Sequence, residues 1–182
     1  MDPAESKLVG AQPVIVLVGL PGSGKSTVGQ RLAAELGVLF RDTDSDIEAS
    51  TARTISDIFV ESGEAHFREL EAVAVLEALA EHRGVLALGG GAVMNPETRK
   101  KLRSHVVAFL DVGLAAAMQR LEMNRSRPLL LGNIRSQWQA LAEERRPLYL
   151  EVAKFTVQTD NRSVDEVVRA ISTWLTEVSG VP

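Results

Sequence analysis

The sequence contains no cysteine. This absence excludes disulfide bonds, thiolate metal sites and a cysteine nucleophile, and it is compatible with a reducing compartment. Long apolar runs are also absent, since no stretch approaches the roughly 18 residues that a membrane-spanning helix needs. The N-terminal residues include acidic side chains and lack the apolar core of a secretory signal. We therefore expect a cytoplasmic protein that does not contact a membrane.

The chain has no excess of basic residues, because 20 Lys and Arg against 24 Asp and Glu give a net charge of −4 at pH 7. The two signs are interleaved, so no basic stripe favours nucleic acid over a small substrate. With 182 residues, 45% of them hydrophobic, the chain can bury one core but is short for two. No internal repeat or low-complexity tract divides it. We expect a monomer with a flexible tail over residues 1–12 and a single domain over residues 13–182.

The most informative segment that is present is GLPGSGKS, a G-x-x-x-x-G-K-S motif at residues 19–26. It follows an apolar run over residues 13–18 and precedes a helical pattern, which is the setting of a phosphate-binding P-loop. Its glycines let backbone N–H groups turn toward a triphosphate, and the N-terminus of the helix favours the anion. A chance glycine-rich turn is the alternative, but the flanking strand and helix disfavour it. The chain is thus predicted to bind ATP or GTP.

Two side chains of the motif have separate expected tasks. Lys25 carries a point charge that can reach the β- and γ-phosphates, and the Ser26 hydroxyl is placed to become a ligand of Mg²⁺. Further nucleotide contacts are expected from the neighbouring positions, namely Gly22, Ser23, Gly24 and Thr27.

Short apolar runs predict strands at residues 13–18, 38–40, 85–88, 106–110 and 155–157. Because the runs are continuous rather than alternating, the strands should be buried on both faces, as in a parallel sheet covered by crossover helices. Apolar positions at helical spacing predict helices at residues 25–36, 55–61, 64–82, 95–104, 113–122 and 163–175. This order indicates a three-layer α/β sandwich, although the pattern predicts no element for residues 134–154.

Local signals mark several helix ends. Gly37 suits a C-terminal stop, and Gly63 separates two helical patterns. Asn95 precedes a proline at the first helical position, which is typical of an N-terminus. Ser163 with Glu166 three residues later fits a capping box.

The ends of the second and third strands carry residues suited to a ligand. Asp42-Thr43-Asp44 has alternate carboxylates, which would face the same side of an extended segment at the edge where ligands bind in open α/β sheets. Alternatively, these aspartates, or Asp46, cap a helix that runs through Ile47. The third strand ends in three glycines at residues 89–91, which form either a site of close ligand approach or only a tight turn.

The remaining pattern narrows the class of nucleotide-binding protein. No N-K-x-D segment and no strand ending in D-x-x-G is present, which disfavours a GTPase switch.

Residues 124–133 match neither helical nor strand periodicity and contain Arg125, Arg127, Pro128 and Gly132, so we interpret them as a mobile, positively charged loop.

The chain resembles the shikimate kinases from Pro13 to about Leu175. The resemblance rests on the P-loop, Asp42-Thr43-Asp44, Phe67-Arg68 with Glu71, the LGGGAV stretch at residues 88–93, RPLL at residues 127–130 and RRPLY at residues 145–149. It implies transfer of a phosphoryl group from ATP to the 3-hydroxyl of shikimate, in the pathway to chorismate and the aromatic amino acids. It also implies a fold similar to nucleoside monophosphate kinases, with strand order 2-3-1-4-5 and a lid over about residues 124–133.

The resemblance also implies roles at the substrate. Arg68 and Arg145 would clamp the carboxylate of shikimate, because an arginine can hold a carboxylate through two hydrogen bonds. Arg146 is an alternative to Arg145. Glu71 would orient Arg68, and the backbone of Gly90 and Gly91 would contact the substrate.

Other residues of the resemblance concern the reaction and the nucleotide. Asp44 would bond the substrate hydroxyls and accept the proton of the attacking one, and Asp42 would hold magnesium through water. Arg127 would reach the phosphates from the lid. Arg120 and Arg162 would lie beside adenine, although Arg120 could instead complement the dipole at a helix end.

Two rivals stand beside this interpretation. Another small-molecule kinase of the same fold, such as a gluconate or nucleoside monophosphate kinase, is disfavoured by the arginine pair and by D-T-D. A non-catalytic nucleotide-binding regulator is disfavoured because Lys25, Ser26, Asp42 and Asp44 are all present.

Overall fold

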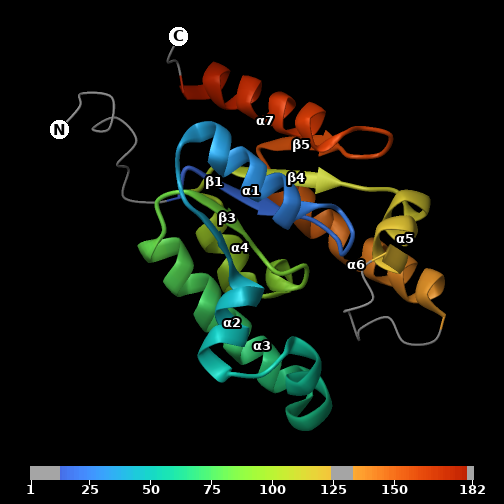
Figure 1. Cartoon of the computed structure of the whole chain (residues 1–182). Helices are drawn as coiled ribbons and strands as arrows, with labels where there is room; N and C mark the ends of the chain where they lie inside the picture. The colour runs from blue at the N-terminus through green and yellow to red at the C-terminus, as the bar shows by residue number, and fades with distance from the viewer. Residues whose placement is uncertain (1–12, 124–132, 180–182) are drawn as a thin grey trace.

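The computed structural model describes residues 13–123 and 133–179. Within them, a five-stranded parallel sheet has the order β2-β3-β1-β4-β5 (Figure 1). The strands are β1 (Ile15–Val18), β2 (Phe40–Asp42), β3 (Val85–Ala87), β4 (Val107–Asp111) and β5 (Phe155–Gln158). The predicted order 2-3-1-4-5 is confirmed, and β1, which leads into the P-loop, lies at the centre of the sheet between β3 and β4.

Helices cover both faces of the sheet, which confirms the three-layer architecture (Figure 1). On one face, Ile15 and Leu17 of β1 share a core cluster with α1 (Lys25–Leu36) and α7 (Val164–Ser179). On the other face, Val16 and Val18 share a cluster with α3 (Ile55–Glu81), α4 (Pro96–Leu102), α5 (Leu114–Met123) and α6 (Ile134–Val152). Every residue of β1, β3 and β4 is buried, so their continuous apolar runs reflect packing on both sides.

The predicted signals at helix ends are present in the structure. Gly37 ends α1 in the left-handed conformation, with φ 66°. Gly63, with φ 83°, interrupts α3 at the position where two helical patterns were expected to separate. The side chain of Asn95 caps α4. Ser163 N donates to Glu166 Oε2 at 2.7 Å and Glu166 N donates to Ser163 Oγ at 3.2 Å, which confirms the capping box.

Two parts of the chain differ from the predictions. β2 begins at Phe40, and the D-T-D segment is not extended, because α2 (Thr43–Thr51) begins directly after Asp42. Residues 134–152, for which the pattern predicts no element, form α6 with Pro147 inside it. The predicted tail and residues 124–132 of the predicted lid lie outside the described residues. None of the described helices combines the length and apolar character needed to cross a membrane.

Candidate active site

Two cavities lie at the edge of the sheet where the parallel strands end. The P-loop cavity has a volume of about 360 Å³, and its lining includes Gly22, Gly24, Lys25, Thr27 and Arg120. The arginine cavity has a volume of about 570 Å³, and its lining includes Phe67, Arg68, Glu71, Gly90, Gly91 and Arg145. Ser26, Asp42 and Asp44 line both. Groups bound in the two cavities would therefore meet at these three residues.

The P-loop connects β1 to α1 and wraps the buried side chain of Lys25. The Lys25 Nζ donates to Gly19 O at 2.7 Å and to Leu20 O at 3.3 Å. Gly24 precedes the helix with φ 90°, a conformation that other residues rarely adopt. The predicted nucleotide contacts, which also include Ser23, thus lie at the N-terminus of α1, where the helix dipole and the N–H groups of the first turn favour an anion.

Asp42 and Asp44 differ in their local setting, which corrects the expectation of two carboxylates on one extended segment. Asp42 ends β2 and accepts a hydrogen bond from Ser26 Oγ at 2.8 Å through its Oδ2. Its Oδ1 accepts from Asp44 N at 2.9 Å, so Asp42 also caps α2. Asp44 lies in the first turn of that helix. The capping alternative is correct for Asp42, and both carboxylates still reach the junction of the cavities.

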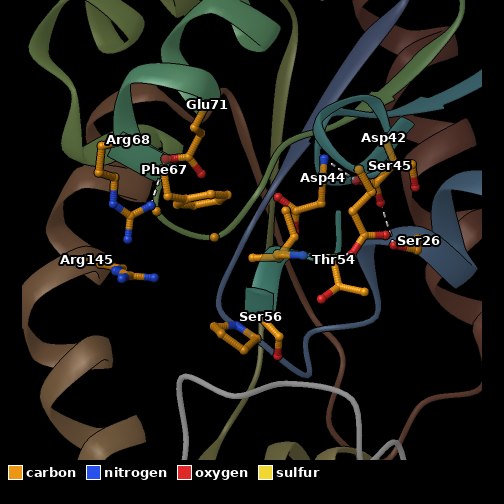
Figure 2. Close-up of a pocket in the computed structure, with 15 residues that line it drawn as sticks. Ser26, Asp42, Asp44, Ser45, Thr54, Ser56, Phe67, Arg68, Glu71 and Arg145 are labelled. Carbon is orange, nitrogen blue, oxygen red and sulfur yellow. Dashed lines mark hydrogen bonds and ion pairs between the residues drawn. The ribbon is translucent and has the colours of Figure 1, made fainter. Parts of the chain in front are cut away.

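Arg68 and Glu71 form an ion pair on one turn of α3. The Arg68 Nη1 contacts Glu71 Oε2 at 2.7 Å, and its Nη2 contacts the exposed Glu64 at 3.2 Å. Burial lowers the pKa of Arg68, but the two carboxylates outweigh it, so this pKa is raised. The guanidinium is therefore permanently charged and held in one orientation. Figure 2 shows Arg68 and Glu71 of α3 and Arg145 of α6 facing the same space, with Asp44 across from them.

Glu71 is only 3% exposed and lies against the glycines that follow β3. A Cβ at Gly89 would be 2.8 Å from Glu71 Oε1 and 2.6 Å from Asp44 Oδ1, and one at Gly91 would collide with the Arg68 guanidinium. Burial raises the pKa of Glu71, and the opposing charge of Arg68 lowers it only in part. The glycines thus allow three charged side chains to approach the backbone closely.

The two adjacent arginines of α6 have different surroundings. Arg145 is 4% exposed and lines the arginine cavity, and its Nε has no hydrogen-bond partner among the described residues. Arg146 instead contacts the buried carboxylate of Asp111 at 2.6 Å. A buried guanidinium with an unused Nε donor is suited to an anionic ligand, whereas Arg146 is already paired with Asp111.

Two of the three arginines expected near the nucleotide belong to the described residues. Arg120 of α5 lines the P-loop cavity and donates to Gly22 O at 3.0 Å and to Thr159 O at 2.9 Å, so it joins the P-loop to the turn after β5. Arg162 follows that same turn, but it is not among the described residues that line the P-loop cavity. Arg127 lies outside the described residues.

Sequence reasoning missed the outer wall of the arginine cavity. This wall comes from α2 and the start of α3, and its residues are Ser45, Glu48, Thr54, Ile55 and Ser56. Figure 2 labels Ser45, Thr54 and Ser56 among them. Glu48 Oε1 accepts from Ile55 N at 3.0 Å, which joins the two helices. No sequence motif marks these residues, because helix packing alone brings them to the cavity. Among the described residues, no group of three or more His, Asp or Glu is placed to hold a metal by itself.

The sequence matches the Shikimate kinase family over residues 21–176. It is 49% identical over 162 residues to a shikimate kinase of Thermobifida fusca, covering 89% of this chain and 94% of that relative. It is 53% identical over 163 residues to a shikimate kinase of Salinispora tropica, covering 90% of this chain and 98% of that relative.

Solved structures give the same result. The shikimate kinase from Acinetobacter baumannii in complex with shikimate superposes with a TM-score of 0.89 at 34% identity, covering 96% of this chain and 98% of that one. The shikimate kinase from Bacteroides thetaiotaomicron superposes with a TM-score of 0.79 at 30% identity, covering 88% of this chain and 97% of that one. The chain therefore belongs to the shikimate kinase family.

Proposed function

We propose that the protein transfers the γ-phosphoryl group of ATP to the 3-hydroxyl of shikimate, giving shikimate 3-phosphate and ADP on the route to chorismate and the aromatic amino acids. The observation that carries this proposal is the junction of the two cavities at Ser26, Asp42 and Asp44. Phosphoryl transfer requires donor and acceptor side by side and in line. Family membership, and the A. baumannii relative solved with shikimate, support shikimate as the acceptor.

The arginine cavity is suited to the carboxylate of the acceptor. Arg68 and Arg145 supply two permanent positive charges from different helices, and Glu71 fixes the orientation of Arg68. The backbone of Gly90 and Gly91 supplies close polar contacts, because no side chain lies in the way.

Asp44 is the residue that we assign to the acceptor hydroxyl. It lines both cavities, so a hydroxyl bonded to its carboxylate faces the P-loop cavity. Its carboxylate can orient that hydroxyl and accept its proton as the bond to phosphorus forms.

Ser26 and Asp42 are suited to Mg²⁺. Their hydroxyl and carboxylate oxygens lie 2.8 Å apart at the entrance to the P-loop cavity, and oxygen ligands that leave room for water and phosphate are what Mg²⁺ prefers. When bound with ATP, the ion neutralises charge on the β- and γ-phosphates.

The nucleotide is assigned to the backbone of residues 22–27, with Lys25 at the phosphates and Arg120 and Arg162 on the adenine side. Resemblance to the family adds Arg127 as a second positive charge at the γ-phosphoryl group, in a lid over about residues 124–133. The expectations of a monomer and of a cytoplasmic location belong to the same proposal.

A coupled assay of ADP release tests the proposed function. The acceptors are shikimate, quinate, gluconate and a set of nucleoside monophosphates, each with ATP and Mg²⁺. We expect ADP release with shikimate at a rate at least about tenfold above the other acceptors. The nucleoside monophosphates test the need for a carboxylate, whereas quinate and gluconate, which also carry a carboxylate and several hydroxyls, test how those groups must be arranged. A higher rate with gluconate or a nucleoside monophosphate, or equal ADP release without an acceptor, would contradict the proposal.

A further inference from the structure

The glycine loop of residues 89–91, between β3 and the 3₁₀ helix η2 (Ala92–Met94), is held by side chains from two other elements. The N–H of Gly89 donates to Thr43 Oγ1 of α2 at 3.1 Å. The hydroxyl of Tyr149 of α6 donates to Gly90 O at 2.5 Å. Thr43 and Tyr149 are both fully buried, at 0% exposure. Neither contact is assigned a task in the reaction described above.

These two hydrogen bonds restrict the backbone conformation of a segment that has no side chains of its own to do so. Glycine has no side chain to restrict its backbone, so a run of three glycines has a wide choice of conformations. In a planar trans peptide the C=O and N–H groups point in opposite directions. Holding the Gly90 carbonyl toward α6 therefore also sets the direction of the Gly91 N–H. Among the described residues, the N–H groups of Gly90 and Gly91 donate to no other residue, which leaves them available to a ligand.

The anchors lie on the same elements as the charged groups of the cavity. Thr43 stands between Asp42 and Asp44 at the start of α2, and Tyr149 follows Arg145 by one turn of α6. The Tyr149 ring stacks on Phe109 of β4, with ring centroids 5.0 Å apart. Burial raises the pKa of Tyr149, so its hydroxyl stays protonated and remains a donor at neutral pH.

We propose that Thr43 and Tyr149 are positioning residues, which hold the Gly90 and Gly91 backbone at the orientation that the acceptor requires. They also fix the position of this backbone relative to Asp44 and Arg145. This inference rests on the proposed function, because it assigns the glycine loop to binding of the acceptor.

Conservative variants test the inference. Tyr149→Phe removes the hydroxyl, which donates to Gly90 O and also interacts with Arg145. Thr43→Val removes the oxygen that accepts from Gly89 N and therefore tests the loop contact by itself. We expect each to lower kcat/KM for shikimate by on the order of tenfold, the effect of losing one hydrogen bond at the site, while KM for ATP changes less than about twofold. Thr43→Ser keeps the acceptor oxygen and should restore most of the loss.

A matched control separates positioning from general stability. Val152→Ala truncates a buried residue of α6 in the same core cluster, without touching the loop or either cavity. It should lower Tm while leaving kcat/KM for shikimate near the wild-type value. Amide hydrogen exchange of the free protein adds a second readout, since the Gly89 N–H loses its acceptor in Thr43→Val and should exchange faster there than in Val152→Ala.

The outcomes distinguish a failure of the proposed function from a failure of the inference about Thr43 and Tyr149. A wild-type protein that does not phosphorylate shikimate overturns the proposed function and this inference with it. A wild-type protein that does so, with Tyr149→Phe and Thr43→Val affecting Tm but not the shikimate kinetics, overturns the inference alone. An equal rise in KM for ATP and in KM for shikimate also overturns the inference, because Thr43 and Tyr149 would then act on the fold as a whole.

Discussion

Asp42 and Asp44 are two residues apart and both reach the junction of the cavities, but their contacts predict different functions. Asp42 accepts from Ser26 and caps α2, whereas Asp44 lies in the first turn of that helix and lines both cavities. Asparagine is as good a helix cap as aspartate, so Asp42→Asn should fold normally. It should raise the Mg²⁺ concentration for half-maximal activity several-fold, because a negative charge beside Ser26 is lost.

Asp44→Asn should instead lower kcat by roughly a hundredfold or more, because it removes the carboxylate that we propose accepts the proton of the attacking hydroxyl. Binding of ATP with Mg²⁺, measured by calorimetry, should stay near the wild-type value. The two variants are controls for each other. If Asp44→Asn shifted the Mg²⁺ requirement and Asp42→Asn abolished turnover, their assigned roles would have to be exchanged.

Glu71 links the site to the pH dependence of stability. Burial raises its pKa above the ordinary value of 4.5, and Arg68 opposes this only in part. The native state therefore keeps a proton at pH values where the unfolded chain has lost it. The contribution of Glu71 to the free energy of unfolding is then fully present below pH 4.5 and is lost as the pH rises through the native pKa.

We expect Glu71→Gln to remove this loss, so that its free energy of unfolding falls less than that of the wild type as the pH is raised from about 4.5 to 7. Urea denaturation at a series of pH values measures the difference. Glu64→Gln is the control, because Glu64 contacts the same arginine but its side chain is 65% exposed. An identical pH slope in Glu71→Gln and the wild type would show that Glu71 ionises alike in the native and unfolded states.

At the scale of elements, α6 has two neighbouring arginines, of which we expect one to affect substrate binding and the other to affect stability. Arg145→Ala should raise KM for shikimate by about tenfold or more, because a charged partner of the carboxylate is lost. Arg146→Ala should leave that KM nearly unchanged but lower the free energy of unfolding by roughly 2 kcal/mol, because the carboxylate of Asp111 is buried and depends on this ion pair. Asp111 would keep its second contact, from Gln158 at 2.6 Å.

Initial-rate kinetics and urea denaturation of both variants provide this comparison, with each arginine serving as the control for the other. A rise in KM for shikimate in Arg146→Ala, without one in Arg145→Ala, would assign the carboxylate to Arg146.

The elements that could be predicted from the sequence are those whose pattern is local. Central strands appear as continuous apolar runs, and Ser163 with Glu166 marks a helix start within four residues. α6 could not be predicted, because its buried side chains include Arg145 and it contains a proline, which normally ends a helix. The end of β2 was ambiguous for a related reason, since Asp42 is suited both to a strand end and to a helix cap.

The candidate site shows the same division. Residues within one motif, such as Lys25 and Ser26, could be identified from their spacing, and Arg68 and Arg145 from the resemblance to a family. Pairings across the sequence could not be identified, because only folding joins Thr43 to Gly89 or Tyr149 to Gly90. A single sequence therefore predicts which residue types are available, and the tertiary structure decides which of them meet.

At the scale of the whole molecule, the two cavities should contribute separately to stability. A ligand that binds only the native state adds RT ln(1 + [L]/Kd), or about 2.7 kcal/mol at a hundred times Kd. For a chain of this size that corresponds to a rise in Tm of roughly 5–10 °C. Shikimate and a non-hydrolysable ATP analogue with Mg²⁺ should each raise Tm when added alone, because each has its own cavity.

Substitutions on opposite sides of the junction should remove these shifts one at a time. Lys25→Met keeps the aliphatic stem within the P-loop but removes the ammonium group, so most of the shift with the ATP analogue should be lost and the shift with shikimate retained. Arg145→Leu should show the converse, since Arg145 lines the arginine cavity and is not among the residues that line the P-loop cavity. Differential scanning fluorimetry of both variants, with each ligand and with neither, measures this pattern. If either variant lost both shifts, occupation of one cavity would depend on the state of the other, and the two ligands would have to bind as a coupled pair.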